Sequence, residues 1–175
     1  MAVKHMRGLE SLVDGLRSDL CEELKLAVEA AADDVADDDP CDRAKRMAVA
    51  FRAWALAHTP EFTLLFDLRP GEQAGACDPS YEIGSVFLDE FAGMWRRDMI
   101  KPPGGALTEN SAKPQLDPRI SVLYPDLSPE LVLAFLRVWT TVCGLVMLEA
   151  NGHLGWLRRD ARELFEIELA DVLRG

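Results

Sequence analysis

Apolar residues recur every three or four positions over most of this chain, which is the period of one face of an α-helix. The first such stretch is the longest, and its apolar positions are Leu9, Leu12, Val13, Leu16, Leu20, Leu24, Ala27, Val28, Ala31 and Val35. It predicts a helix of about 28 residues, roughly 40 Å long. The aspartates that cluster in residues 33–39 should end this helix, because negative charge is unfavourable at a helix C-terminus.

Four further helix starts are marked by a capping residue followed by proline, at Asp39-Pro40, Thr59-Pro60, Asp78-Pro79 and Ser128-Pro129. The capping side chain accepts a hydrogen bond from the first turn, and proline loses nothing at the first helical position. These starts predict helices near 41–57, 60–67, 79–100 and 129–151, and apolar spacing predicts a sixth over about 157–173. No stretch sustains the two-residue period of a strand, so the predicted fold class is all-α with six helices.

Residues 101–128 interrupt this helical pattern. They contain Pro102, Pro103, Gly104, Gly105, Pro114, Pro118 and Pro125. We expect no regular element here, because proline and glycine disfavour helices and strands. Loops of this length are usually functional lids or disordered insertions, and the polar centre favours a mobile loop.

The helix predicted at 129–151 has almost no polar face, and a helix that is apolar all round is buried all round. The helix at 157–173 covers part of it. A second copy of the protein could cover the rest, through a twofold interface in which both helices pair with their mates, and the alternative is a fully internal helix. The residues assigned to this interface are Leu131, Phe135, Val138, Val142, Leu145, Leu157, Ala161, Leu164, Phe165 and Val172.

Aromatic residues gather on helices that should face one another. Phe87, Phe91 and Trp95 follow each other at four-residue steps in 79–100, and Phe51 and Trp54 lie in 41–57. Such rings can line a cavity for an apolar or aromatic ligand between helices. They can equally fill the core, and both interpretations stay open.

Composition narrows the classes of function. The chain has 175 residues, a formal net charge of -11 and 49% hydrophobic residues. This size and composition predict one soluble, cytoplasmic domain without a membrane span, and the acidity argues against non-specific nucleic-acid binding. Scattered cysteines and histidines predict reduced thiols and no metal site, and no catalytic triad, phosphate loop or cofactor motif can be assembled.

Two segments resemble the C-terminal ligand-binding and dimerisation domain of TetR-type transcriptional regulators, in particular the WHG subgroup. The first segment is MAVAFRAWALAHTPEFTLLFDLRP, and its matching residues are Trp54, Ala55, His58, Pro60, Phe62 and Phe66, with Thr59 inserted. The second is VWTTVCGLVMLEANGHL, and its matching residues are Trp139, Gly144, Leu148, Glu149, Gly152 and His153. Cys143 stands where the subgroup has histidine.

The beginning, AVKHMRGLESLVDGL, is similar to the family's join between the DNA-recognition helix and the regulatory domain, with Val3 in place of a tyrosine. The resemblance therefore implies two parts, a remnant of the recognition helix and linker at 1–8 and a ligand-binding and dimerisation domain at 9–175. The two preceding helices of a helix-turn-helix are absent, so operator DNA would be bound only through a missing N-terminal unit.

The resemblance implies a homodimeric repressor that senses a small apolar or aromatic effector among the helices at 41–57, 79–100 and 129–151, with the helix at 60–67 near the mouth. The residues assigned to this pocket are Trp54, Phe62, Phe66, Phe87, Phe91, Trp95, Trp139, Cys143 and Met147. One alternative is a stand-alone module that binds a small molecule or a partner without binding DNA. Another is a small helical enzyme that depends on Glu149, His58 or His153; the residues favour a regulator over an enzyme.

Overall fold

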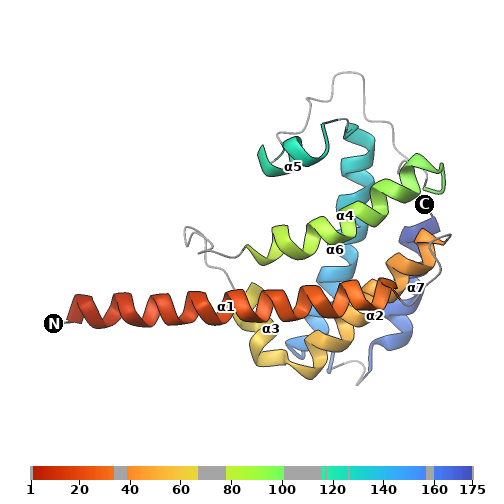
Figure 1. The fold of residues 1–175 in the computed structure, drawn as a ribbon. Helices are drawn as coiled ribbons and strands as arrows, with labels where there is room; N and C mark the ends of the chain where they lie inside the picture. The colour runs from red at the N-terminus through yellow and green to blue at the C-terminus, as the bar shows by residue number, and fades with distance from the viewer. Residues whose placement is uncertain are drawn as a thin grey trace.

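The computed structural model in Figure 1 describes residues 2–33, 39–66, 78–100, 116, 118–125, 127–156 and 160–174, with the backbone alone for 2–10 and 174. Every regular element in these residues is a helix, which confirms the all-α class. The helices are α1 (Ala2–Asp33), α2 (Pro40–Ala57), α3 (Thr59–Phe66), α4 (Pro79–Arg96), α5 (Pro118–Leu123), α6 (Pro129–Ala150) and α7 (Arg162–Arg174).

Three of the four capping assignments are confirmed by hydrogen bonds. Asp39 accepts from the amide of Asp42 at 3.0 Å, Asp78 from that of Tyr81 at 3.2 Å, and Ser128 from that of Leu131 at 3.1 Å. Thr59 was wrongly assigned as a cap of α3. Its hydroxyl donates to the carbonyl oxygen of Ala55 at 3.3 Å, at the end of α2. The hydroxyl therefore provides a hydrogen-bond donor for a carbonyl group at the C-terminal end of α2, not an acceptor for the first turn of α3.

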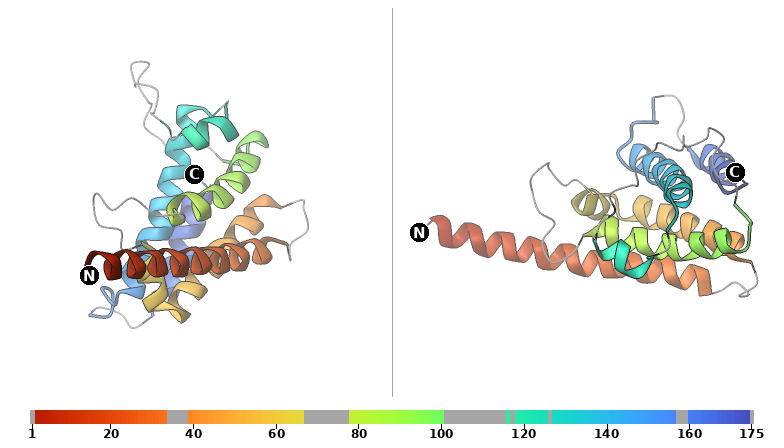
Figure 2. Two further views of the ribbon diagram at one scale, coloured as in Figure 1. Left: turned by 60° about the vertical axis from the view of Figure 1, so that its left-hand side comes forward. Right: turned by 90° about the horizontal axis from the view of Figure 1, so that it is seen from above.

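Helix α1 ends at Asp33, within the acidic run as predicted, while Val35 lies outside the described residues. At its other end α1 is helical from Ala2 and passes without a break through residue 8, where the sequence placed the end of a linker. The N-terminal part of α1 projects away from the other helices (Figures 1 and 2), and Leu12 and Leu16 on it are exposed.

Polar contacts fix the C-terminal part of α1 on its neighbours. The indole nitrogen of Trp54 donates to Glu23 at 3.0 Å, and the Arg17 guanidinium donates to the carbonyl oxygen of Leu64 at 3.2 Å. Arg43 on α2 lies 2.8 Å from the Glu90 carboxylate and donates to the carbonyl oxygen of Ala32 at 3.0 Å. One guanidinium thus joins α1, α2 and α4.

The segment predicted to lack regular structure contains the short helix α5, so that prediction was wrong for residues 118–123. Proline is the first residue of α5, where its missing amide has no intrahelical partner in any case. The part of the predicted mobile loop at 101–115 lies outside the described residues.

Helix α6 is not buried all round, contrary to the prediction. It packs between α2, α4 and α7, and its buried residues Leu131, Ala134, Val138, Val142 and Val146 follow one stripe. The opposite side is open, and Leu133, Leu136 and Leu148 are between 38% and 46% exposed. Of the described residues, α6 is also the one helix long and apolar enough to cross a membrane by length and composition alone.

Candidate functional site

Seven aromatic rings from α2, α3, α4 and α6 form a continuous cluster. Its centre is Phe51, which is fully buried and has the rings of Phe62, Phe66, Phe87 and Trp139 within 5.6 to 6.2 Å of its own centroid. Three of these contacts are edge-to-face, the arrangement that the ring quadrupoles favour. Several rings assigned to the pocket from the sequence therefore lie together, around a residue that was not assigned to it.

Two more rings extend the cluster along α4 and α6. Trp139 stacks on Phe135 at 6.1 Å, and Phe135 meets Phe91 edge-on at 5.7 Å. The gap that this cluster leaves toward α2 and α7 has a volume of only about 10 Å³. That is room for one water molecule at most. In this conformation the space between α2, α4 and α6 is packed core, and it does not hold a ligand.

The larger space lies on the other side of Trp139, between α4 and α6 and beneath α5. This α4–α6 groove has a volume of about 270 Å³. Its walls are Ser80, Tyr81, Gly84, Ser85, Leu88, Leu116, Ile120, Leu127, Val132, Phe135, Leu136 and Trp139. Trp139 is thus shared between the core cluster and the groove, and a ligand in the groove would rest against the cluster's edge.

A second hollow of about 230 Å³ continues along the same two helices, and we call it the Arg96 hollow. Its walls are Ala92, Trp95, Arg96, Leu123, Tyr124, Pro125, Leu127 and Leu131. Leu127 is common to both spaces. Each volume lies just below the range of about 300 to 1,000 Å³ for small-molecule sites, and the mainly apolar lining is typical of them.

Helix α5 and the residue that follows it are held over the groove by side chains of α4 and its cap. Arg119 lies 2.9 Å from the Asp78 carboxylate, and its guanidinium covers the Tyr81 ring at 3.9 Å. The Tyr124 hydroxyl donates to Asp89. Burial and this hydrogen bond raise the pKa of Tyr124 well above its usual value, so the hydroxyl keeps its proton and remains a donor. None of the residues of α5 is buried. The position of α5 over the groove therefore depends on these polar contacts more than on apolar packing.

The remaining residues assigned to the pocket divide between the core and its margins. Trp54 is buried against α1 and stacks on His58 at 4.9 Å, and His58 is the C-cap of α2. Cys143 and Met147 are partly buried beside the core. Burial raises the pKa of the Cys143 thiol to about 12, so this cysteine is neutral near pH 7 and does not act as a thiolate.

Most residues assigned to the dimer interface lie inside the single chain. Six of them are less than 9% exposed, namely Leu131, Val138, Val142, Ala161, Phe165 and Val172. Phe135 and Leu145 are half-buried, and Leu157 lies outside the described residues. Leu164 is 38% exposed. A surface for a partner on α6 and α7 would therefore keep Leu164 and need further exposed residues.

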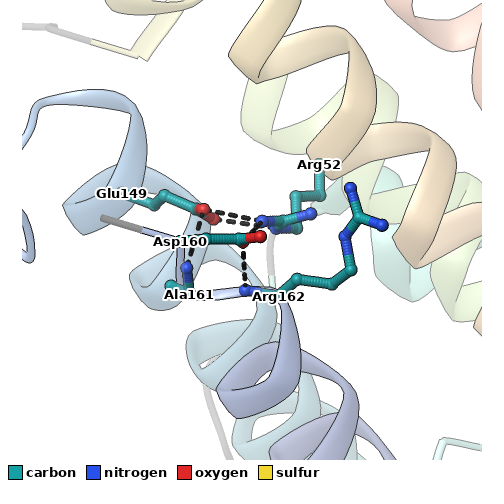
Figure 3. A network of polar contacts seen from close by, with 5 residues as sticks. All are labelled: Arg52, Glu149, Asp160, Ala161 and Arg162. Carbon is teal, nitrogen blue, oxygen red and sulfur yellow. Dashed lines mark hydrogen bonds and ion pairs between the residues drawn. The ribbon is translucent and has the colours of Figure 1, made fainter. Parts of the chain in front are cut away.

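Glu149, at the end of the apolar run of α6, has a charged partner on α2 (Figure 3). Arg52 donates to both of its carboxylate oxygens, at 2.8 and 2.6 Å, and the side chains are only 11% and 14% exposed. Asp160 lies 3.4 Å from the same guanidinium, and the amide of Ala161 donates to Glu149 at 3.3 Å. The network joins α2, the end of α6 and the start of α7, and it is an ion pair that positions helices.

Within the described residues, no group of three His, Cys, Asp or Glu side chains is placed to hold a metal ion. Cys41 and Cys143 are free thiols. The described residues that line the groove include no histidine, carboxylate or lysine that could act as the base of a paired nucleophile. Its geometry suits binding of an apolar molecule.

A sequence model of the family described as tetracyclin repressor-like, C-terminal domain, matches residues 44–172 of the chain. The chain belongs to this family. The match confirms the resemblance at the level of the TetR-like domain, and it extends from within α2 to within α7. No match was found among the curated proteins. A TetR-like domain of this kind is regulatory, and it is the ligand-binding and dimerisation part of a transcriptional regulator.

Sequence reasoning missed three features of the TetR-like domain. The first is Arg52, whose partner Glu149 lies 97 positions further along the chain, so no local pattern connects them. The second is the central position of Phe51, which the sequence placed among the facing rings but not in the pocket. The third is α5, although Asp117-Pro118 repeats the signal of a capping residue before proline that located four other helices.

Proposed function

We propose that this chain is the effector-sensing and dimerisation domain of a TetR-type repressor, and that it binds a small apolar or aromatic molecule in the α4–α6 groove. The observation that carries the proposal is the groove itself, about 270 Å³ with mostly apolar walls and Trp139 on its floor. Trp139 also packs on Phe87 at 5.6 Å and on Phe51 at 6.2 Å. A ligand that moved Trp139 would thus change the packing of α2 and α4.

Such a change can reach α1, because α1 packs on both α2 and α4. A ligand that fits one arrangement of these helices better than another shifts the population between them. Operator binding by the proposed repressor would use a helix-turn-helix unit outside the helices described above. Effector binding would lower operator affinity through the differential contacts that the two arrangements make.

The groove can be tested with a pair of glycine substitutions on α4. A side chain added at Gly84 enters the groove and meets the Trp139 ring, 3.7 Å from the position of a Cβ, whereas a Cβ at Gly93 has no atom within 4 Å. We expect Gly84→Leu to weaken binding of the apolar fluorescent probe N-phenyl-1-naphthylamine by about tenfold or more, since a leucine side chain would occupy the space of several ligand atoms. Fluorescence titration of the probe measures this.

The matched control is Gly93→Leu, which makes the same change in the same helix outside the groove. Both substitutions raise helix propensity by about 1 kcal/mol, so a difference between them reports the groove. Equal probe affinities for the two variants, or no probe binding by the unsubstituted protein, would contradict the proposed site.

We place the proposed dimer interface on the exposed faces of α6 and α7. Five exposed apolar side chains mark these faces, and they are Leu133, Leu136, Leu148, Leu164 and Ile167. An apolar face of this kind is stabilised when a second copy covers it, and twofold pairing uses the same patch on both copies. The proposed interface thus keeps the helices assigned from the sequence, retains Leu164 and otherwise uses different residues.

This interface predicts that Ile167→Lys weakens the dimer, because a lysine buried at the contact loses its hydration. We expect the dissociation constant to rise by about tenfold or more, which corresponds to roughly 1.4 kcal/mol. Light scattering after size-exclusion chromatography over a range of concentrations measures it. The control is Leu26→Lys on α1, where the leucine is 56% exposed and Ile167 is 52% exposed. A monomeric unsubstituted protein, or equal behaviour of both variants, would count against the interface.

A further inference from the structure

We infer that the ligand of the groove is an elongated aliphatic carboxylic acid, whose chain lies in the α4–α6 groove and whose carboxylate pairs with Arg96. This inference rests on the proposed function, because it assigns a chemical class to the ligand of the same site. It adds the Arg96 hollow to that site as the place where the polar end of the ligand lies.

The first argument is the shape of the site. Gly84 is a wall of the groove and Arg96 is a wall of the hollow, and both lie on α4. At a rise of 1.5 Å per residue the two positions are about 18 Å apart along the helix. A single ring would occupy one of the two spaces and leave the other empty. An extended chain can follow α4 through both, past Leu127.

The second argument is the apolar character of the walls along this path. Leu88, Ile120 and Leu136 contribute to the groove, and Leu123 and Leu131 to the hollow. Hydroxyl groups occur at the far end of the groove, where Ser80, Tyr81 and Ser85 are walls. An aliphatic chain gains from burial against the apolar walls in proportion to its area, and it leaves no polar group of its own unpaired there.

The third argument is charge. Of the described residues that line the two spaces, Arg96 alone is charged, and no carboxylate of the described residues forms an ion pair with it. Asp89, whose carboxylate bonds the wall residue Tyr124, accepts the hydrogen bond of the Tyr124 hydroxyl. The protein as a whole carries a formal charge of -11, which repels anions elsewhere on its surface. A carboxylate would therefore find its favourable partner in this hollow.

The experiment compares dodecanoate with 1-dodecanol, which has the same chain and no charge. Each is titrated below its aggregation concentration into the full chain at pH 8, and intrinsic tryptophan fluorescence reports binding, because Trp139 and Trp95 are walls of the two spaces. We expect the unsubstituted protein to bind dodecanoate roughly fivefold more tightly than the alcohol, the size of effect that an ion pair with an exposed arginine allows.

The matched variants are Arg96→Gln and Arg97→Gln, at neighbouring positions of which only the first is a wall of the hollow. We expect Arg96→Gln to remove the preference for the acid and to leave the affinity for 1-dodecanol unchanged, while Arg97→Gln keeps the preference. Both arginines are exposed at the end of α4, and circular dichroism verifies that each variant is folded.

Two results would overturn the inference. One is equal affinity of the unsubstituted protein for the acid and the alcohol, and the other is a preference for the acid that survives in Arg96→Gln. In either case binding of 1-dodecanol and of the naphthylamine probe, blocked by Gly84→Leu, would leave the proposed function standing. If the probe binds in that way and neither dodecyl compound does, the inference alone is overturned. Failure of all three compounds to bind would overturn both.

Discussion

Replacing Phe51 by alanine is expected to lower the free energy of unfolding by about 3 to 5 kcal/mol, the range for a fully buried phenylalanine. Its side chain is 0% exposed, and it contacts rings of α3, α4 and α6 from its position on α2. Removing it leaves a cavity where four rings meet, and rings held by the helices around it cannot collapse fully into the space. Urea unfolding followed by circular dichroism, at one fixed protein concentration, measures the loss.

The control for Phe51→Ala is Val49→Ala, two positions earlier on the same helix. Val49 is 51% exposed, so its truncation should change stability by less than about 0.5 kcal/mol. A small effect of Phe51→Ala, similar to that of Val49→Ala, would show that the aromatic cluster is not the centre of the core. A change in the slope of the unfolding curve as well as its midpoint would indicate a change in cooperativity.

Replacing Arg52 by alanine is expected to destabilise the fold by about 2 to 4 kcal/mol, because it leaves the Glu149 carboxylate without its partner in a mostly buried site. The pair is bidentate, and both side chains are less than 15% exposed. The guanidinium also lies 5.6 Å from the Phe165 ring centroid, so the substitution loses packing as well as charge. The same unfolding measurement applies.

Two control variants distinguish the loss of the ion pair from the general effect of replacing an arginine on α2. Arg46→Ala removes an arginine of the same helix that pairs with Asp42 at 3.1 Å, with both side chains at least 42% exposed, and we expect it to cost less than about 0.5 kcal/mol. The double variant Arg52→Met/Glu149→Gln removes both charges and keeps an acceptor for the amide of Ala161. It should recover at least half of the loss, since no charge then remains buried. Additive losses in the double variant would contradict this account.

Much of the fold could be predicted from the sequence because its determinants are local. The bonds at Asp39, Asp78 and Ser128 depend on residues three positions apart, and so the starts of α2, α4 and α6 followed from short patterns. At Thr59 the same pattern misled, because a threonine hydroxyl can also bond the carbonyl four residues earlier, and here it does. Helix α5 was missed because a proline-rich segment was judged as a whole and not position by position.

The candidate site was harder to predict, because its shape depends on which side of each ring faces a neighbouring helix. The spacing of Phe87 and Phe91 placed both on one face of α4, opposite the rings of α2, and Phe87 does meet Phe51. The pattern could not tell that the space between them is filled. It also could not place the groove on the other side of Trp139, since one of its walls is α5, a helix that the prediction lacked.

The projecting N-terminal part of α1 converts a small tilt of the helix into a larger displacement of its tip. Arg17, Glu23 and Lys25 are bound to α3, α2 and α4, so the arm beyond them pivots with the body of the protein. From Arg17 to Ala2 the arm is about 22 Å long, and a tilt of about 10° at its base moves its tip by about 4 Å. A rearrangement of α2 and α4 too slight to open the packed core is thereby magnified into a displacement larger than a hydrogen bond is long. In a twofold dimer the two tips would move symmetrically, so the distance between them would change by up to twice that displacement.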